Sequence, residues 1–423
     1  AFAGNYYKGA LSLFIPFSFL FVGLLGFQEI ISGKPLNKWV LFLSSLLWLC
    51  LLWYPYNTPD VIISTAMQLK VSVFILGYTA LLWMFSEGML KKAVYPMLVS
   101  VVSIEALLLA WPAINDRTAL LKTDITDKKY HFDYSGDAVK RIEELDPASF
   151  YRIDKVYGSI KTGYNDGMVQ GFFGSKTYQS HNHKGYVEFL DKAGVIDASK
   201  EQNTRWLVGV SATGILHGLF SIKYLLSNAA SQEKVDPAIY TAIDTVGNVT
   251  ISSNNYYIPF GIPMESYLSE SAFEKLPINQ RRRAFYFAAV GEDNASWKSR
   301  LTPLATDTIS FFGTATRDRT QALAGKAMVM DHFSQKRIKG HIEPEQPVML
   351  FFSIPYDGGW QATVDGKPQE VHKVNYGFTG VVVDSGKHAI ELRYEPPMSK
   401  TGWIGVLVGL LFAGILYRFR KNF

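Results

Sequence analysis

The stretch AVYPMLVSVVSIEALLLAW, from Ala93 to Trp111, decides the fold class of this chain. It is almost wholly apolar, and a helix of this length, at about 1.5 Å per residue, crosses a hydrocarbon core of roughly 30 Å. Its one acid is Glu105, and a charge inside a membrane span needs a partner or a function. The residues before it are mostly apolar, whereas those after it, up to Pro397, have the composition of a water-soluble region. We therefore predict membrane helices followed by a large domain outside the bilayer.

Five segments have the length and composition of membrane-spanning helices. Buried core helices are the alternative for apolar runs of this length, but Trp and Tyr residues at the ends of the segments favour membrane spans. The five segments are Ala10–Ile31, Trp39–Pro55, Val61–Phe85, Ala93–Trp111 and Gly402–Tyr417. The chain begins with Ala1 and not with methionine, and we expect it to be the later part of a longer protein.

The positions of the basic residues predict the orientation in the membrane. Cations occur in the loops 32–38 and 86–92 and in the tail after Tyr417, whereas the loop 56–60 has none. Because cytoplasmic loops carry an excess of Lys and Arg, these three cationic segments should face the cytoplasm. Residues 113–400 should then lie outside, and the net charge of +5 reflects topology. No basic run indicates a nucleic-acid groove, so nucleic acid is not an expected partner.

The outer region is predicted to consist of two parts. Residues 113–325 mix helical and strand patterns, including a half-buried strand at 150–157, a buried strand at 221–227 and a helix at 279–290. From residue 326 the apolar period changes to two, and short strands are separated by turns such as Asp365-Gly366. We therefore predict a membrane bundle (1–112), a mixed α/β domain (113–325), a small β-sandwich (326–400) and a last span with a basic tail (401–423). The one cysteine, Cys50, lies in a predicted span, so the outer region should fold without disulfides, as in a bacterial envelope protein.

Several motifs resemble a known family. PYDGGWQATVDGKP and GKHAIELRYEPP, near the carboxyl end, resemble the closing signature of the YfhO family of bacterial membrane proteins. YRI at 151–153, SIKYLLS at 221–227, NNYYIPFGIP at 254–263, Gln280 and NYYKGALSLF at 5–14 agree in the same order. One departure is Tyr178-Gln179-Ser180, where the family usually has Tyr-Ser-Ser.

The resemblance implies a multispanning protein similar to glycosyltransferases of the GT-C type. Such an enzyme takes a sugar from a polyprenyl-phosphate carrier and transfers it to a cell-envelope polymer such as lipoteichoic acid, outside the membrane. The catalytic acid of GT-C enzymes usually lies in the first outer loop of the amino-terminal half, which this sequence does not include, so the catalytic base cannot be assigned. The alternative is a non-catalytic membrane protein that binds or presents an envelope polymer.

Lys70 and Glu105 are the main candidates for binding substrate within the membrane. From the predicted ends of their spans, Glu105 should lie about 9 Å deep and Lys70 about 13 Å deep, on consecutive antiparallel helices. An ion pair beside the phosphate or sugar of the carrier is the functional interpretation. A structural pair, or a lysine that extends to the interface, is the alternative. Asp60, in the one acidic short outer loop, is a weak candidate for the catalytic base.

Further candidates lie in the outer region, each with a structural alternative. Arg281, Arg282 and Arg283 could hold a polyanion or a carrier phosphate, although a solvated basic turn is commoner. Trp360 could stack on a sugar or be a core aromatic. His181 and His183 lack the third ligand that a metal site needs, so no cofactor is evident, and a divalent metal has no support in the sequence.

Overall fold

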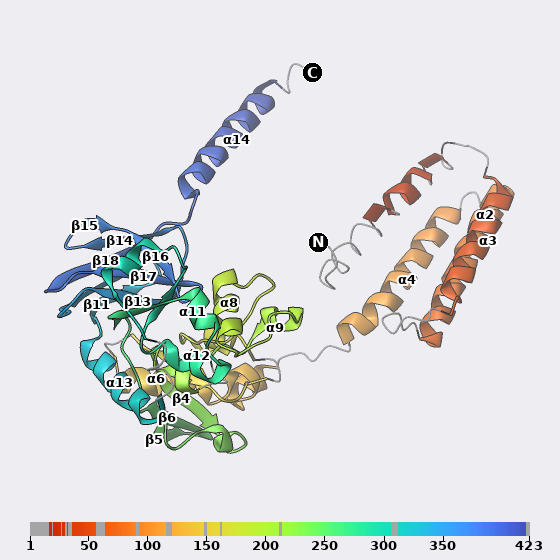
Figure 1. The fold of residues 1–423 in the computed structure, drawn as a ribbon. Coiled ribbons are helices and arrows are strands. Elements are labelled where there is room, and N and C mark those ends of the chain that lie inside the picture. The colour runs from red at the N-terminus through yellow and green to blue at the C-terminus, as the bar shows by residue number, and fades with distance from the viewer. Residues whose placement is uncertain are drawn as a thin grey trace. The chain divides into compact units, whose positions relative to one another are not determined.

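The fold is described from a computed structural model of the chain. The structure describes residues 17–18, 20–26, 28–29, 32, 36–55, 64–89, 93–115, 121–147, 150–160, 163–210, 214–305 and 312–419. It divides into two compact units, Ala1–Leu120 and Leu121–Phe423 (Figure 1). Each unit is described by itself.

The first unit is helical. Its defined helices are α2 (Lys38–Leu52), α3 (Thr65–Ser86) and α4 (Val94–Asn115). Asn37 and Ser64 begin α2 and α3 by accepting hydrogen bonds from free backbone N–H groups of the first turn. The Ser45 and Thr79 hydroxyls, 2.6 Å apart, join α2 to α3. Most apolar side chains of these helices point outward, which is the pattern expected of helices surrounded by lipid.

Two helices are long and apolar enough to cross a membrane, as judged by length and composition over the described residues. They are α3 and the carboxy-terminal α14 (Ser399–Phe419). The helix α2 and the segment 96–108 of α4 are shorter apolar stretches. Half of the residues of the span predicted at 10–31 lie outside the described residues. The mixed α/β character and the two long apolar helices are therefore confirmed, while five spans remain a prediction.

The second unit contains most of the secondary structure. Its helices are α5 (Lys122–Thr126), η1 (Tyr130–Phe132), α6 (Ser135–Leu145), α7 (Asp166–Gln170), α8 (Lys184–Lys192), α9 (Glu201–Arg205), α10 (Gly214–His217), η2 (Gln232–Lys234), α11 (Glu270–Glu274), α12 (Ile278–Ala284), η3 (Ser296–Arg300) and α13 (Phe312–Lys326). Its strands are β1 (Arg152–Lys155), β2 (Thr177–Tyr178), β3 (Trp206–Leu207), β4 (Ile222–Asn228), β5 (Tyr240–Val246), β6 (Val249–Asn254), β7 (Ile262–Met264), β8 (Ser266–Ser269), β9 (Ala289–Gly291), β10 (Thr302–Pro303), β11 (Val329–Ser334), β12 (Arg337–Ile342), β13 (Val348–Pro355), β14 (Trp360–Val364), β15 (Lys367–Gln369), β16 (Val371–Val374), β17 (Phe378–Val383) and β18 (His388–Tyr394).

The predicted β-sandwich is formed by two sheets. One has the order β11-β12-β18-β14-β15, and the other has the order β16-β17-β13-β7. Apolar side chains of both sheets share one core, in which Ile338 and Leu392 of the first sheet join Leu350, Phe352 and Val381 of the second. Alternate residues of each strand supply this core, as the period-two pattern predicts.

The sandwich is not separate from the rest of the outer unit. The strand β7 precedes residue 326, yet it pairs with β13 and completes the second sheet. The other face of that sheet, which includes Phe351 and Phe378, packs against Phe189 of α8 and Phe285. Because both faces are covered, β17 is buried at every position. Residue 326 therefore marks a change of pattern within a body that shares a sheet and a core.

A third sheet positions the candidate site. Its order is β1-β4-β6-β5, with β1 parallel to β4. The amphipathic helix α6 covers this sheet, and Val139 and Ile142 pack on Ile153 and Leu226. The strands predicted at 150–157 and 221–227 are confirmed as β1 and β4.

Candidate active or binding site

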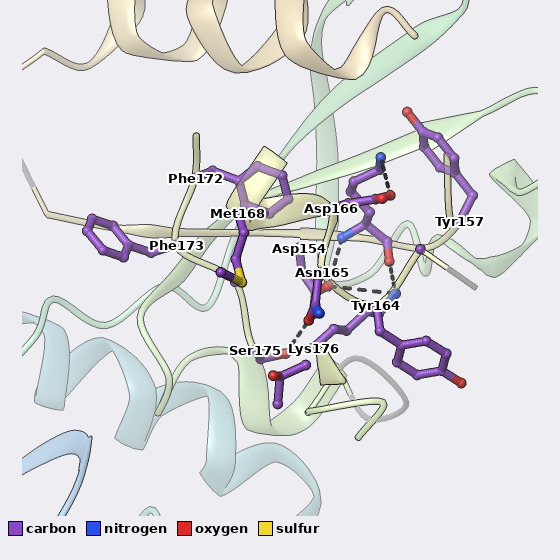
Figure 2. Close-up of a pocket in the computed structure, with 15 residues that line it drawn as sticks. Asp154, Tyr157, Tyr164, Asn165, Asp166, Met168, Phe172, Phe173, Ser175 and Lys176 are labelled. Atoms are coloured by element: carbon purple, nitrogen blue, oxygen red, sulfur yellow. Dashed lines mark hydrogen bonds and ion pairs between the residues drawn. The ribbon is translucent and has the colours of Figure 1, made fainter. Parts of the chain in front are cut away.

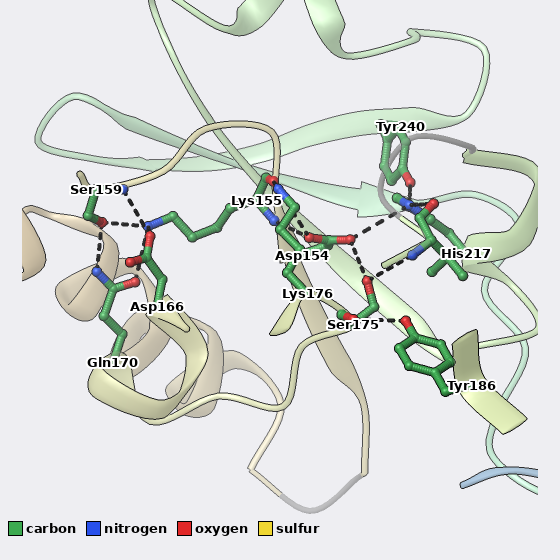
Figure 3. Close-up of polar contacts among 11 residues, drawn as sticks. Asp154, Lys155, Ser159, Asp166, Gln170, Ser175, Lys176, Tyr186, His217 and Tyr240 are labelled. Atoms are coloured by element: carbon green, nitrogen blue, oxygen red, sulfur yellow. Dashed lines mark hydrogen bonds and ion pairs between the residues drawn. The ribbon is translucent and has the colours of Figure 1, made fainter. Parts of the chain in front are cut away.

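The carboxyl end of β1 carries two adjacent charged residues, Asp154 and Lys155, that are both buried. Successive side chains of a strand point to opposite faces, so each residue has its own surroundings. Figure 3 shows the two resulting groups of polar side chains, one around Lys155 and one around Asp154. Buried charges are stable only when they are paired and hydrogen-bonded, so the partners of each residue decide its role.

The ammonium group of Lys155 is held by three side chains. Its Nζ donates to Asp166 Oδ2 at 2.9 Å, to Ser159 Oγ at 2.7 Å and to Gln170 Oε1 at 3.1 Å. Burial lowers the pKa of Lys155, and Asp166 opposes that shift. Burial would raise the pKa of Asp166, but the Lys155 charge and the hydrogen bonds from Ser159 outweigh it, so that pKa is lowered. All three ammonium donors are used, and this group is a closed structural pair.

The contacts of the Asp154 carboxylate with described residues are mostly to neutral groups. It accepts from the Lys155 backbone N–H at 2.7 Å and from Ser175 Oγ at 3.2 Å. The Lys176 ammonium lies near it, with Nζ 3.9 Å from Oδ1, and the Lys176 side chain keeps 24% of its surface exposed. Lys176 Nζ also donates to the Lys155 carbonyl oxygen. An ammonium has three donors, so Lys176 can bind a further acceptor from outside.

His217 lies beside this carboxylate and is neutral. Burial lowers its pKa, and Asp154, whose Oδ2 is 3.8 Å from Nε2, opposes that shift. The contacts fit one tautomer, in which Nε2–H donates to the Val210 carbonyl at 3.2 Å and Nδ1 accepts from the Tyr240 hydroxyl. His217 therefore lies against the buried side of Asp154 as a neutral neighbour.

The pocket at the end of β1, called the β1 pocket below, has a volume of about 210 Å³. Both charged groups contribute to its wall, and Figure 2 shows the side chains that surround it. Its lining combines carboxylates, ammonium groups, aromatic rings and an amide, and it includes Asp154, Lys155, Tyr157, Tyr164, Asn165, Asp166, Met168, Phe172, Phe173, Ser175 and Lys176. A mainly apolar hollow with a few fixed polar groups is the usual form of a small-ligand site.

A group of three aromatic rings, called the aromatic rim below, adjoins the β1 pocket through Tyr164, the one of the three that lines the pocket. The rings of Tyr178 and Trp206 stack with centroids 4.0 Å apart, and Tyr164 meets the Trp206 ring edge-on at 5.4 Å. Asn165 fixes this rim because its amide donates to the Tyr178 carbonyl and accepts from the Tyr178 N–H, at 3.0 and 2.8 Å. Exposed rings beside hydrogen-bonding groups suit the alternating apolar and hydroxyl faces of a sugar.

The two candidate residues of the predicted membrane spans, Lys70 and Glu105, do not form the expected ion pair. Glu105 instead accepts a hydrogen bond from Tyr78 of α3 at 2.5 Å, and no ion pair involves Lys70 among the described residues. The helix ends explain the difference, because α4 continues to Asn115 and α3 begins at Thr65. Glu105 then lies about 15 Å from the helix end and Lys70 only about 8 Å. Lys70 is exposed, as expected of a lysine that extends to the interface.

The three arginines lie in a different part of their helix from the one expected. The helix α12 ends at Ala284, so they occupy its last turn, where the helix dipole favours cations. Arg281 donates to the carbonyls of Leu276 and Glu274, and Arg282 to those of Ala193 and Gly194. These two guanidinium groups cap the carboxyl ends of helices α8 and α11, which favours the structural interpretation.

The remaining predicted residues do not meet at one site. Trp360, at the start of β14, is half-buried and packs against Tyr394 with ring centroids 5.0 Å apart, as a core aromatic would. His181 and His183 are both exposed, and no group of three or more His, Cys, Asp or Glu suited to a metal occurs among the described residues. Asp60 lies outside the described residues.

The sequence interpretation missed the β1 pocket. The signal that could have found it is the pair Asp154-Lys155 inside FYRIDKVY, a strand with apolar residues on both sides. In an alternating strand, adjacent charges point to opposite faces, so at least one of them must be buried and partnered.

Two of the motifs that carried the family resemblance, YRI and NNYYIPFGIP, meet in the fold through Arg152 and Phe260. Arg152 of the YRI motif donates from Nη1 to the Phe220 carbonyl at 2.7 Å and to Ser353 Oγ at 2.8 Å. Its guanidinium lies over the rings of Phe150 and Phe260, the latter from the NNYYIPFGIP motif. Burial lowers the pKa of Arg152 to about 10, so it remains charged at neutral pH. Arg152 thus connects β1 with Phe220, just before β4, and with Ser353 of β13, two residues before Asp154.

Comparison with known proteins identifies the family of the chain. The family profile described as "Bacterial membrane protein YfhO" matches residues 13–320 and 310–404. The chain belongs to the YfhO family. It is 20% identical over 416 residues to the YfhO protein of Bacillus subtilis (strain 168), an alignment that covers 72% of this chain and 47% of the relative. The chain thus spans about half the length of that relative, and no solved structure is significantly similar to it.

Proposed function

We propose that this chain belongs to a membrane glycosyltransferase that transfers a sugar from a polyprenyl-phosphate carrier to an envelope polymer such as lipoteichoic acid. In this proposal the β1 pocket binds a segment of the polymer acceptor. The observation that carries it is the lining of that pocket, where the Lys176 ammonium lies beside a carboxylate and an aromatic rim, in a chain that also has membrane-length helices. Residues 113–400 would lie outside the cell, and the carboxyl terminus would be cytoplasmic.

Each part of the pocket fits one part of such a polymer. Lys176 would bind a phosphate of the polymer backbone, because its partly exposed ammonium has donors to spare. Tyr164 and the stacked Tyr178–Trp206 pair would contact the faces of sugar or polyol units. The closed Lys155–Asp166 pair would keep the loop between β1 and β2 in place. Asp154 orients Lys176 and is itself held by Ser175.

The reaction would be a displacement at the anomeric carbon of the carrier-bound sugar. An acceptor oxygen forms the new bond to that carbon, the bond to the carrier phosphate breaks, and the acceptor proton passes to a carboxylate base. Phosphate leaves without needing a proton, so one base is sufficient. By the GT-C resemblance that base belongs to the amino-terminal half, so the described residues contribute acceptor binding.

The test is transfer of labelled sugar from a polyprenyl-phosphate donor to a lipoteichoic-acid acceptor by the full-length protein. Lys176→Met should raise the KM for the acceptor about tenfold or more, because a hydrogen bond between charged groups contributes about 1.5–3 kcal/mol. Lys200→Met is the matched control, since Lys200 is an exposed lysine of the same unit, paired with Asp197. Equal KM values for the two variants would contradict acceptor binding at the β1 pocket.

The alternative is a non-catalytic protein that binds or presents the envelope polymer. The same lining supports it, because binding needs no base. Absence of sugar transfer by the full-length protein, combined with polymer binding that Lys176→Met weakens, would favour the alternative.

A further inference from the structure

An exposed apolar patch lies at the beginning of the outer unit. It consists of Leu121, Ile125, Phe132, Met168 and Val169, and is called the apolar patch below. Met168 exposes 80% of its surface and Leu121 exposes 61%, although both are apolar. Ile125, Phe132 and Val169 line one hollow of about 360 Å³, so α5, η1 and α7 bring these side chains together. Contiguous exposed apolar surface usually marks an interaction site.

The surroundings of the patch resemble those of a membrane interface. Lys122 and Lys140 are exposed near it, and the ring of Tyr130 is 41% exposed beside Phe132. Lys129 is paired with Asp127, and acidic side chains also line the hollow, namely Asp133, Asp137 and Glu143. Aromatic rings and lysines gather where protein meets the headgroup layer, since rings sit at the headgroup level and ammonium groups reach phosphates. An apolar centre with a polar edge is also the form taken by segments that lie in the interface.

The covalent chain limits how far the patch can be from the bilayer. Residues 116–120 join Asn115, the end of α4, to Leu121, and a chain of this length reaches at most roughly 20 Å even when extended. The helix α4 contains the apolar segment from which the membrane prediction began. Leu121 therefore has to lie close to the bilayer surface if α4 crosses it.

We propose that the apolar patch docks onto the lipid leaflet at the carboxyl end of α4, with Met168, Val169, Leu121 and Ile125 in the boundary between headgroups and acyl chains. Met168 also lines the β1 pocket, so docking brings the mouth of that pocket to the headgroup level. A lipid-linked donor or acceptor presents its phosphate at this level. This last consequence rests on the proposed function, whereas docking itself does not.

The test uses an environment-sensitive fluorophore on single cysteines. Cys50→Ser removes the cysteine of this chain, and a new cysteine at position 168 or 125 carries the NBD label. The matched control is position 243, because Ile243 is 46% exposed and belongs to β5, which contributes no residue to the apolar patch. The labelled 423-residue chain is placed in nanodiscs of phosphatidylglycerol and phosphatidylethanolamine, with or without a spin label at carbon 5 of the acyl chain.

The proposal predicts a blue-shifted emission and at least twofold stronger quenching by the spin-labelled lipid at positions 168 and 125 than at 243. Val169→Asp should reduce the quenching at position 125, because it places a charge in the same hollow. Equal quenching at all three positions would overturn the proposal. So would a blue shift without quenching, because protein and not lipid would then cover the patch. Neither result depends on sugar transfer, so failure of docking and failure of the proposed function are distinguishable.

Discussion

Asp154 and Lys155 are neighbours on one strand, yet the groups around them differ in kind. Lys155 meets an opposite charge at 2.9 Å and uses all its donors within the protein. Asp154 meets a neutral imidazole, a hydroxyl and an ammonium at 3.9 Å that is partly exposed. A charge that is fully paired inside the protein stabilises the fold, whereas a partly exposed ammonium can bind a ligand. We therefore assign structure to the Lys155 side and binding to the Lys176 side.

The largest expected effect tests the structural side of this comparison. Lys155→Met should destabilise the outer unit by about 3–5 kcal/mol, because it leaves the buried Asp166 carboxylate without its cation. The measurement is the free energy of unfolding from denaturant titration. Lys155→Met with Asp166→Asn should recover part of the loss, and Lys200→Met should change stability by less than about 0.5 kcal/mol. A loss below 1 kcal/mol for Lys155→Met would show that the pair is not structural.

The second prediction concerns the pH dependence of stability, to which His217, beside Asp154, should contribute. Burial lowers the pKa of His217 below the ordinary 6.5, so below that pH the unfolded chain binds a proton that the folded chain does not. Stability should therefore fall as pH decreases from about 6.5 towards the folded pKa, by at most about 1.4 kcal/mol per pH unit. His217→Gln should remove this part of the slope when stability is measured between pH 7.5 and 5.5. An unchanged slope would contradict a neutral, buried His217.

Several strands were predictable from the sequence, because their core-facing residues follow a pattern within each strand. The stretches 348–354, 360–364, 378–383 and 389–394 alternate or are continuously apolar, and they form β13, β14, β17 and β18. The three-residue strand β7 was not predictable, since it has no period of its own and depends on pairing with β13. The arginine turn was misplaced because the helix at 279–290 was predicted too long, and α12 ends at Ala284.

The adjacent charges of β1 could have been noticed in the sequence, but the set of residues that surrounds them could not be predicted. The residues of the pocket and those that support it come from separate segments, with Asp166 in α7, Lys176 before β2 and His217, behind Asp154, in α10. The parallel pairing of β1 with β4 brings His217, which precedes β4, beside Asp154, and neither spacing nor composition encodes that meeting. The Lys70–Glu105 pair failed for a smaller reason, a few residues' error in the helix ends.

The membrane candidates offer the smallest predicted effect. Glu105→Gln should weaken packing between α3 and α4 by about 0.6–2 kcal/mol, because the bond from Tyr78 loses its charged acceptor. Lys70→Met should have no measurable effect on stability, since Lys70 is exposed near the start of its helix. Thermal unfolding in detergent compares the two variants. A greater loss for Lys70→Met would restore a role for that lysine.

The central claim is that the partly exposed Lys176 side of β1 binds the acceptor, while the closed Lys155 side only supports it. The most direct measurement is the acceptor KM for labelled-sugar transfer by the full-length protein, compared between Lys176→Met and Lys200→Met, with unfolding free energies measured on the same preparations. The account predicts a roughly tenfold or greater rise in KM for Lys176→Met, and the unfolding free energies show how much of the Lys176→Met protein is folded in the assay. An acceptor KM for Lys176→Met equal to that of Lys200→Met, at unchanged stability, would contradict it.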